Sequence, residues 1–545
     1  MSEIDFQWND PQLRWTKNGM KYLKTAPILP EWNDAFWIYW KRNSESMRAK
    51  GYSTFKDKAG KWFISQWFNE VPVGTKILKK KQPEINMVSD LELTPLKNST
   101  GLKSWQIGAT ERLIASIKKH GSAIDASETG CGKSYCAVAV ARELKLKIGV
   151  ICPLAVCEPW RRVIEDHFGM KVQFIKNYES LRTGKYGKDI VKWGKLNDSK
   201  AKNARNAFIW KCSKDTLLIF DEAHKCKGLD TKNSKLLKSA KDAGYKILCC
   251  SATSAINPLE LRAMGYALGL HTYKNFYMWI QDNGCKKGRF GYEFNGDKYV
   301  LQTLHKQMIL DRGVRLKRDD IPDFPESDIQ AIAYSVGTDA ELSLKTIYTS
   351  MMQELKTLET RTGKNKSEDN QLVIKLRARQ KSELIKVPLF VELAERALED
   401  DMSVVLFLNF RDSITSVAER LGTSCIVWGD NKGNERQKCI DEFQSDKSRV
   451  IIVNIQSGNS GIGLHDITGK HPRIALISPD YSAVNLKQVL GRVQRTGGKT
   501  KSLQRIVYAA NTVEEEVCRT IQYKLKNMDI INDSDCSPET TKIFK

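Results

Sequence analysis

The sequence lacks the features that would place it in a membrane, in a secreted compartment or around a structural metal. No stretch of about 18 apolar residues occurs, and residues 1–15 contain no basic segment followed by an apolar one, so we expect neither membrane spanning nor secretion. The thirteen Cys include no CxxC pair and the seven His do not lie beside them at zinc-ligand spacing, which argues against zinc and against a disulfide framework. Reduced thiols in an intracellular protein, cytoplasmic or nuclear, are the simpler interpretation.

Acidic residues are too few to balance the basic ones. There are 87 Lys and Arg against 64 Asp and Glu, a formal charge of +23 on 545 residues. A field of this size favours a polyanionic partner such as nucleic acid, although a lysine-rich solvated surface would give the same count. The 41% of apolar residues is enough to build several cores.

Residues 1–95 are rich in tryptophan and in cations. They contain seven of the thirteen Trp, and residues 11–81 carry 15 Lys and Arg against 5 Asp and Glu. Aromatic rings interleaved with cations suit base stacking together with phosphate contact. We predict a small aromatic-rich accessory domain in which most Trp form the core, and nucleic-acid binding by this domain stays open.

Two later zones alternate helical patterns with short apolar runs, which is typical of a parallel sheet covered by helices, with the chemistry at the carboxyl ends of its strands. We therefore predict an α/β fold with two such domains, at residues 96–265 and 386–530. Residues 266–385 between them are mostly helical in pattern, and residues 531–545 are predicted to be a tail. The apolar runs are 123–126, 147–153, 216–224 and 245–253 in the first zone, 403–410, 449–456 and 473–479 in the second, and a hairpin-like stretch follows at 284–300.

The stretch TGCGKS has the form of a phosphate-binding loop, although Ser127 stands where the general pattern has its first Gly. Gly130 and Gly132 lead into Lys133 and Ser134, and a helical pattern follows. Such a loop turns backbone N–H groups toward phosphate oxygens at a helix N-terminus. Lys133 would reach the β and γ phosphates and Ser134 would bind magnesium, with a chance turn as the alternative.

A second element follows about 90 residues later, in LLIFDEAHK (217–225). It is an apolar strand that ends in two adjacent carboxylates. A magnesium nucleotide needs one carboxylate for the metal and one to orient or deprotonate the attacking water. Asp221 suits the metal and Glu222 suits the water, whereas an ordinary acidic helix start would explain only one of them.

TGCGKS and DEAH together resemble the motifs of superfamily 2 helicases and translocases, in which the first Gly is not required. Other segments resemble the Swi/Snf-type ATPases of that superfamily, in the correct order. The resemblance implies two RecA-like lobes, ATP with magnesium as cofactors, and an adenine contact at Gln106. It also implies nucleotide contacts at Thr129, Gly130, Cys131, Gly132 and Gly461. The segments that carry it are 102–114, 150–168, 251–264, 308–326, 429–446, 454–466, 488–495 and 511–528.

The segment QVLGRVQR (488–495) explains why a second lobe is needed. Arg492 and Arg495 are spaced i, i+3, which predicts one face of a helix from which guanidinium groups point across a cleft at the γ-phosphate. An arginine supplied in this way raises turnover by roughly 10³- to 10⁵-fold in phosphoryl-transfer enzymes. We therefore predict Lys133, Asp221, Glu222, Arg492 and Arg495 as the catalytic residues.

Three positions depart from the Swi/Snf pattern or leave a choice open. The third motif is SAT (251–253), as in unwinding helicases, and Gln494 stands where the Swi/Snf-type proteins usually have His. His224 either couples the nucleotide and nucleic-acid sites or is an ordinary hydrogen-bonded His.

The resemblance also implies a nucleic-acid track across both lobes, bound mainly at phosphates and therefore without sequence preference. The track residues it implies are Pro153 and Trp160 in the first lobe, and Ser457, Gly458 and Asn459 in the second.

We predict an ATP-driven translocase on DNA, most favourably duplex or branched, that remodels DNA structures or protein–DNA complexes and has protein partners as a further option. One alternative is a strand-separating DEAH-type helicase on DNA or RNA. Another is an ATP-gated scaffold, or a transcription termination or release factor.

Overall fold

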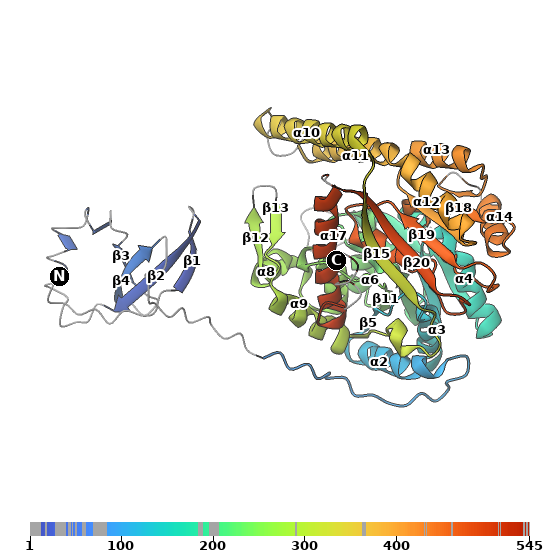
Figure 1. Ribbon diagram of the computed structural model, residues 1–545. Helices are drawn as coiled ribbons and strands as arrows, with labels where there is room; N and C mark the ends of the chain where they lie inside the picture. The colour runs from blue at the N-terminus through green and yellow to red at the C-terminus, as the bar shows by residue number, and fades with distance from the viewer. Residues whose placement is uncertain are drawn as a thin grey trace. The chain divides into compact units, whose positions relative to one another are not determined.

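The computed structural model describes residues 84–537 except for short gaps, together with Thr540, Ile543 and parts of residues 12–68. The gaps are 184–188, 196–205, 289–290, 362–366, 430, 432, 459–461, 511 and 513. The chain forms two compact units, Met1–Glu84 and Ile85–Lys545 (Figure 1). The division falls before residue 95, where the accessory domain was predicted to end. The segment around Ser89 belongs to the second unit because Ser89 accepts a hydrogen bond from Arg112 of that unit.

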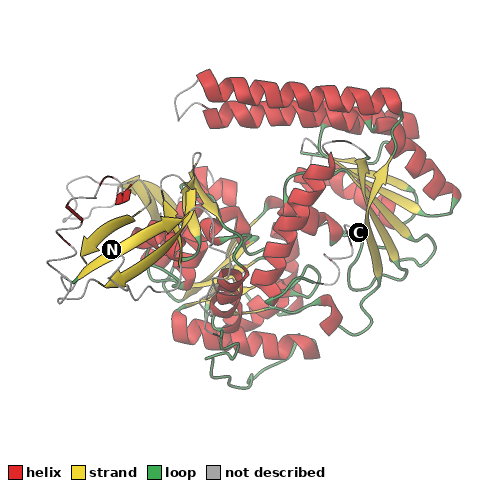
Figure 2. Cartoon of the chain, turned by 60° about the vertical axis from the view of Figure 1, so that its left-hand side comes forward, coloured by secondary structure: helices red, strands yellow, loops and turns green. Residues whose placement is uncertain are grey.

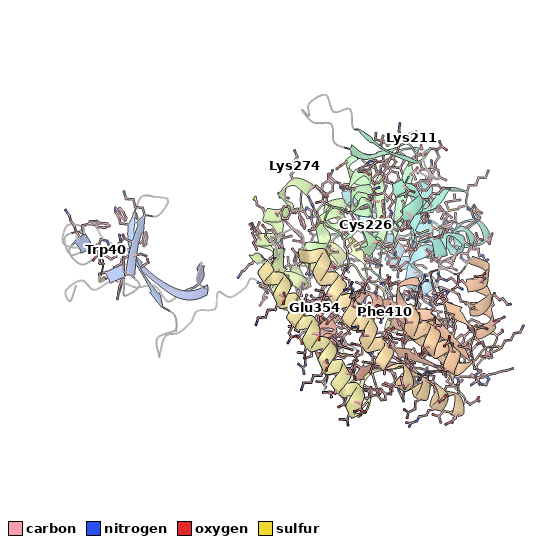
Figure 3. All side chains as sticks on the ribbon, turned by 90° about the horizontal axis from the view of Figure 1, so that it is seen from above. Trp40, Lys211, Cys226, Lys274, Glu354 and Phe410 are labelled. Atoms are coloured by element: carbon pink, nitrogen blue, oxygen red, sulfur yellow. The ribbon has the colours of Figure 1, made fainter. Side chains whose placement is uncertain are left out.

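The first unit contains an antiparallel sheet in the order β1-β2-β4-β3. Ala26 and Ile64 pair in register and are fully buried, and Trp40 is buried (Figure 3). Trp40 therefore belongs to the core of this unit, whereas Trp37 and Trp62 are half-buried, so the prediction that most of its Trp form the core stays open. The strands are β1 Gln12–Thr16, β2 Gly19–Pro27, β3 Tyr52–Lys56 and β4 Trp62–Phe68.

The first lobe of the second unit is built on a six-stranded parallel sheet in the order β14-β5-β11-β10-β6-β7. It contains all four strands predicted for this zone. The strands are β5 Ser122–Asp125, β6 Lys147–Cys152, β7 Val172–Asn177, β10 Thr216–Asp221, β11 Lys246–Cys250 and β14 Gly313–Val314. The helices of this lobe are α2 Ser104–His120, α3 Lys133–Glu143, α4 Cys157–Arg162, α5 Tyr178–Thr183, α6 Lys232–Asp242 and α7 Arg262–Leu268, and a hairpin joins β8 Val191–Lys195 to β9 Asn206–Trp210.

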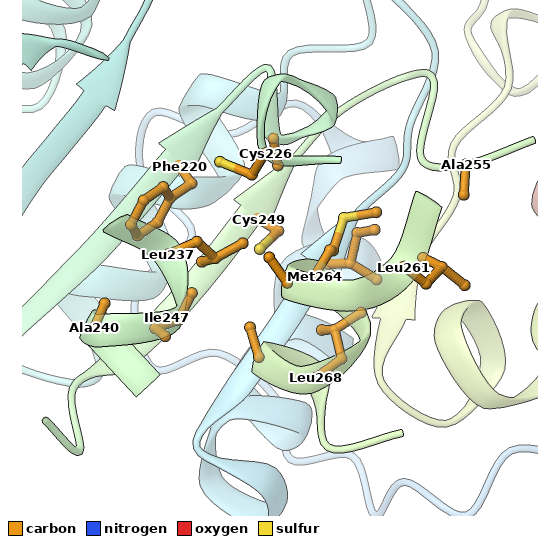
Figure 4. Close-up of a cluster of buried hydrophobic side chains, with 14 of the residues drawn as sticks. Phe220, Cys226, Leu237, Ala240, Ile247, Cys249, Ala255, Leu261, Met264 and Leu268 are labelled. Atoms are coloured by element: carbon orange, nitrogen blue, oxygen red, sulfur yellow. The ribbon is translucent and has the colours of Figure 1, made fainter. Parts of the chain in front are cut away.

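Both faces of this sheet are buried, because successive residues of a strand point to opposite faces. Phe220 and Cys249 pack with Leu237 of α6 and Met264 of α7 on one face (Figure 4). Ile219, Leu248 and Cys250 pack with Leu113 of α2 and Val138 of α3 on the other. The continuous apolar runs in the sequence follow from this double burial.

The second lobe is built on another six-stranded parallel sheet, in the order β15-β20-β19-β16-β18-β17. The predicted fold class, two parallel-sheet lobes of RecA type, is confirmed. The strands are β15 Ser327–Tyr334, β16 Ser403–Leu408, β17 Ile426–Val427, β18 Val450–Asn454, β19 Arg473–Ile477 and β20 Ser502–Ala509. The helices are α12 Val387–Glu399, α13 Arg411–Leu421, α14 Gly433–Gln444, α15 Ile455–Gly458, α16 Ala483–Leu490 and α17 Glu514–Asp533.

Helix α17 belongs to the cores of both lobes. Ile521 and Met528 pack in the core of the second lobe, whereas Ile530 and Ile531 pack in the core of the first. The predicted tail after residue 530 also packs, since Ile543 is buried in the second core. The end of α17 therefore lies where the two lobes meet.

Residues 266–385 contain more than helices and a hairpin. The strand β14 completes the first sheet and β15 the second, so the chain passes from one lobe to the other between Val314 and Ser327. A Cβ on Gly313 would lie 2.3 Å from the carbonyl oxygen of Ile124, so only glycine lets β14 pair there. Figures 1 and 2 show α10 and α11 side by side. The elements of this region are α8 Phe276–Asp282, β12 Cys285–Gly288, β13 Gly291–Phe294, α9 Lys298–His305, α10 Thr338–Arg361 and α11 Ser367–Ile385.

Candidate nucleotide-binding site between the lobes

The loop between β5 and α3 has the backbone of a phosphate-binding loop. Gly130 and Gly132 have φ angles of +95° and +88°, in the region that favours glycine. A Cβ on Gly132 would lie 2.0 Å from Nε2 of Gln106. Helix α3 begins at Lys133 with Gly132 as its N-cap, so no capping side chain covers its first N–H groups. These groups and the helix dipole suit an anion.

Lys133 is held against the same loop. Its Nζ donates to the carbonyl oxygens of Ser127 at 2.8 Å and Glu128 at 3.0 Å. The Lys133 ammonium donates to these two carbonyl oxygens as it would donate to phosphate oxygens. Ser134 follows in the first turn of α3, as its predicted role requires.

Gln106 lies beneath the loop and is buried. Its Oε1 accepts from the backbone N–H of Lys103 at 2.9 Å, and its Nε2 donates to the carbonyl of Cys131 at 3.2 Å. The side chain therefore fixes the loop. Its contact with adenine stays a prediction.

Cys131 is buried between the two glycines. Burial raises the pKa of its thiol to about 11, and the Sγ lies 3.6 Å from the carbonyl oxygen of Leu316. The thiol is therefore protonated at neutral pH, which favours a small tolerated residue over a reactive one.

Asp221 ends β10, and its carboxylate is fixed by two donors. Oδ2 accepts from Nε1 of Trp160 at 2.8 Å, and Oδ1 accepts from the backbone N–H of Glu222 at 3.0 Å. Burial, followed by the neighbouring Glu222, raises the pKa of Asp221 to about 6. A divalent cation at this carboxylate would remove that penalty.

Glu222 has a φ of +51°, which is unusual for a residue with a side chain and costs about 1–3 kcal/mol. Its Oε2 lies 3.2 Å from Nδ1 of His224. Burial opposes ionisation, but the hydrogen bond from His224 and the charge of Lys133 lower the pKa of Glu222 to about 2. The carboxylate is therefore ionised at neutral pH and able to accept a hydrogen bond from the attacking water.

His224 connects three of the motifs. Its Nδ1 lies 3.1 Å from Oγ of Ser251 and 3.3 Å from Oγ1 of Thr253, both in the SAT segment. Its Nε2 lies 3.5 Å from Nε2 of Gln488 in the second lobe. Because an amide nitrogen only donates, Nε2 of His224 is the acceptor and Nδ1 carries the proton. These contacts favour the coupling role over that of an ordinary His.

The second lobe reaches this site through α16 and the turn after it. Nε2 of Gln488 donates to Oε2 of Glu222 at 3.2 Å, across the lobes. Arg492 is buried, and its Nη1 donates to the carbonyl of Ile462 at 3.5 Å. Nε of Arg495 donates to the carbonyl of Gly491 at 3.2 Å.

One part of the prediction for the two arginines is wrong. The i, i+3 spacing predicted a common helix face, but α16 ends at Leu490 and Gly491 is its C-cap, so both arginines lie in the following turn. Burial lowers the pKa of Arg492 to about 10. Burial and the charge of Arg492 together lower the pKa of Arg495 to about 9. The negative charge of Glu222 opposes both of these pKa shifts. Two guanidinium groups therefore share one carboxylate, and an additional anion would stabilise them.

A third arginine, missed in the sequence, joins the lobes beside the loop. Nη2 of Arg318 donates to Oγ1 of Thr129 at 3.0 Å, and Nη1 donates to Oε1 of Gln494 at 2.7 Å. Gln494 in turn donates to the carbonyl of Pro325 at 2.9 Å. Gln494 stands where the Swi/Snf-type proteins usually have His, and both its amide oxygen and its amide nitrogen form hydrogen bonds here. A cavity of about 930 Å³ borders these residues.

A buried ion triad ties the same loop to α17. Arg315 lies 3.1 Å from Oε1 of Glu128 and 3.0 Å from Oδ2 of Asp533. Burial by itself would raise the pKa of Glu128, but the charges of Arg315 and Arg318 outweigh that effect and lower the pKa to about 2. Neighbouring Asn532 accepts from Oγ of Ser254 at 2.6 Å, directly after the SAT segment. No periodicity or motif pointed to these partners, because some 200 residues separate them.

The first-lobe part of the predicted nucleic-acid track stays a prediction, and burial argues against a direct contact by its two side chains. Pro153 and Trp160 are both buried, and the Trp160 indole is committed to Asp221. Neither side chain is accessible to a phosphate backbone. In the second lobe, Asn459 and Gly461 lie outside the described residues, and Ser457 and Gly458 are described only as part of α15.

Trp160→Phe separates the two roles of this residue. The change removes the Nε1 donor to the half-buried carboxylate of Asp221, and we expect the free energy of unfolding to fall by about 1–3 kcal/mol. Nucleic-acid affinity should stay within twofold, measured by fluorescence anisotropy beside urea unfolding. Trp193→Phe, at a 37% exposed Trp, is the control for ring loss. Weakened nucleic-acid binding with unchanged stability would restore the track assignment.

The residues present fit ATP and magnesium. The bare N-terminus of α3, Lys133, and the crowded arginines are complementary to a triphosphate. Ser134 and Asp221 would hold the metal, whose role is to neutralise charge on the phosphates. Within the described part of the chain, no three His, Cys, Asp or Glu side chains cluster to bind a metal by themselves. That is compatible with a cation held mostly by nucleotide and water.

Over the same described ranges, no helix is both long enough and apolar enough to cross a membrane.

Two family models match the chain, one in each lobe. Residues 99–255 match "Type III restriction enzyme, res subunit", and residues 386–497 match "Helicase conserved C-terminal domain". The first match covers the phosphate loop and DEAH, and the second ends just after the two arginines.

Curated relatives also match. The chain is 30% identical over 482 residues to "Putative ATP-dependent RNA helicase L364" of Acanthamoeba polyphaga mimivirus, across 84% of this chain and 88% of that protein. It is 22% identical over 448 residues to "SWI/SNF-related matrix-associated actin-dependent regulator of chromatin subfamily A-like protein 1 homolog" of Caenorhabditis elegans, across 79% of this chain and 62% of that protein. It is also 28% identical over 105 residues to "DNA repair and recombination protein RAD54-like" of Drosophila ananassae, across 19% of this chain and 13% of that protein.

Proposed function

Since the chain belongs to the superfamily 2 helicases, whose ATP-dependent motors act on nucleic acid, we propose that it hydrolyses ATP to translocate along duplex DNA. Its task would be to remodel DNA structures or protein–DNA complexes. The relative named as a SWI/SNF-related regulator of chromatin and the one named as a DNA repair and recombination protein support DNA as the track. The charge of +23 supports a polyanionic partner.

The observation that carries the ATPase part of the proposal is the contact between Gln488 and Glu222. It joins the lobes at the carboxylate proposed to activate water. Lys133 binds the phosphates, Asp221 and Ser134 hold the metal, and Arg492 and Arg495 stabilise charge on the γ-phosphate. Hydrolysis then requires both lobes. A change in the contact between the lobes would produce the step along nucleic acid.

The same contact gives nucleic acid a way to control hydrolysis. His224 links Glu222 to the SAT segment, since its Nδ1 lies 3.2 Å from Oε2 of Glu222 and 3.1 Å from Oγ of Ser251. A nucleic acid that aligns the lobes would bring Gln488, Arg492 and Arg495 to the nucleotide together. Turnover should therefore rise when the correct nucleic acid is bound.

Triplex displacement tests translocation without strand separation. A third strand bound to one end of a linear duplex should be released in the presence of ATP, and Lys133→Ala should not release it. A tailed duplex of the same length should stay paired. Separation of the tailed duplex without triplex release would contradict the proposal.

A second candidate is strand separation on RNA. The SAT segment and the printed name of the mimivirus relative favour it. It predicts that ATP turnover responds to RNA or single strands and not to duplex DNA. The same oligonucleotides used for the triplex assay, made as RNA, distinguish the two candidates.

A further inference from the structure

Four tyrosines form a row on the surface of the first lobe, outside the nucleotide site. They come from four elements: Tyr266 from α7, Tyr273 from η6 (Tyr273–Asn275), Tyr277 from α8 and Tyr292 from β13. None of them belongs to a motif used above. We call them the tyrosine row. Figure 1 shows α8 beside the β12–β13 hairpin that carries the last of them.

Ring contacts make the row continuous. The Tyr266 and Tyr273 centroids are 5.4 Å apart, and those of Tyr277 and Tyr292 are 5.6 Å apart. Arg262 bridges the two pairs, since its guanidinium lies 4.7 Å from the Tyr273 ring and 5.6 Å from the Tyr277 ring. The rings are therefore ordered before any ligand arrives.

The outer part of the row is not needed to fill a core. Phe276, Ile280 and Cys285 form the small cluster beneath it. Tyr277 is 43% exposed and Met278 is 67% exposed. Two large side chains are therefore exposed at successive positions of α8.

Cations surround the row. Lys238 of α6 lies 4.9 Å from the Tyr273 ring, and Arg262 contacts both pairs of rings. Asp230 and Asp242 pair with Arg262 and Lys238 and hold these two cations against the rings. Lys274, at the periphery in Figure 3, is exposed, as are Lys286 and Lys287 in β12.

We propose that the tyrosine row binds single-stranded nucleic acid, with bases against Tyr277, Met278 and Tyr292 and phosphates at the lysines. Every base offers a ring face for stacking, so such a surface accepts any sequence. A duplex hides those faces and would meet only the cations. The row is thus a second contact, separate from the track across the lobes and independent of ATP.

Binding without nucleotide tests this directly. The probes are a fluorescein-labelled 20-nucleotide oligothymidine and a labelled 20-base-pair duplex, read by anisotropy at fixed salt. Tyr277→Ala/Met278→Ala should weaken oligothymidine binding about tenfold or more, because stacked bases are lost. Duplex affinity should stay within twofold. Tyr277→Phe keeps the ring and should bind oligothymidine as the wild type does.

Leu342→Ala/Met352→Ala is the matched control, since these side chains of α10 are 63% and 61% exposed. It should leave oligothymidine binding unchanged. An unchanged affinity in Tyr277→Ala/Met278→Ala, an equal loss in the control, or an equal loss for the duplex would each overturn the proposal. Because no ATP is present, the result does not depend on whether the chain translocates.

Discussion

Replacing Glu222 by Gln is expected to lower ATP turnover by about 10²- to 10⁴-fold, the contribution of a positioned general base. The amide is nearly isosteric and keeps an oxygen for Gln488, but it no longer accepts a proton. Because the pKa of Glu222 is lowered to about 2, its carboxylate is ionised throughout the neutral range and can orient the attacking water. ATP binding should change by less than about threefold, since Lys133 and the loop are untouched.

Steady-state phosphate release and binding of a fluorescent ATP analogue measure the two quantities. Glu293→Gln, at an exposed acid of β13, is the control for loss of one negative charge. If Glu222→Gln retained a third or more of wild-type turnover, another group would have to activate the water.

Replacing Arg495 by Ala is expected to reduce turnover by about 10³-fold or more, the range for an arginine that stabilises a transferring phosphoryl group. The structure places this half-buried guanidinium beside Arg492, where desolvation and the charge of that neighbour lower its pKa to about 9. Such crowding is unfavourable without an anion, so the γ-phosphate gains most from both charges at the transition state. ATP affinity should fall far less than turnover.

The measurement is kcat and ATP-analogue affinity with saturating nucleic acid. Arg519→Ala, at an exposed arginine of α17, removes a charge from the same lobe and should keep wild-type turnover. Loss of affinity with unchanged kcat would mean that Arg495 binds ground-state nucleotide only.

Much of the site could be predicted because it depends on the ends of buried strands. The run before Asp221 is apolar on both faces, and the first polar residues after it must lie at the edge of the sheet. The same reasoning located TGCGKS after β5 and SAT after β11. Parallel strands then bring these three segments together without further information.

One prediction was wrong and one was weakened because a position in a motif was treated as a position in space. Trp160 lies in a segment that resembles a nucleic-acid contact, but whether a side chain is buried depends on tertiary packing that a motif does not specify. Arg492 and Arg495 were placed on a helix, whereas Gly491 between Leu490 and Arg492 is itself a helix-stop signal. That signal was present in the sequence and outweighs the i, i+3 spacing.

Other parts carried no local signal. The Glu128–Arg315–Asp533 triad joins residues far apart in the chain, and charged residues of these types occur throughout it. The two residues of β14 are too few for any periodicity. Only the fold brings such residues together.

ATP turnover with and without nucleic acid tests the central claim, a nucleotide site completed by the second lobe under the control of nucleic acid. The measurement compares no nucleic acid, duplex DNA, single-stranded DNA, RNA and forked DNA, for the wild type and for Lys133→Ala. We predict strong stimulation by duplex DNA and no turnover in the variant. Equal turnover with and without every nucleic acid, or full turnover in Lys133→Ala, would contradict the account.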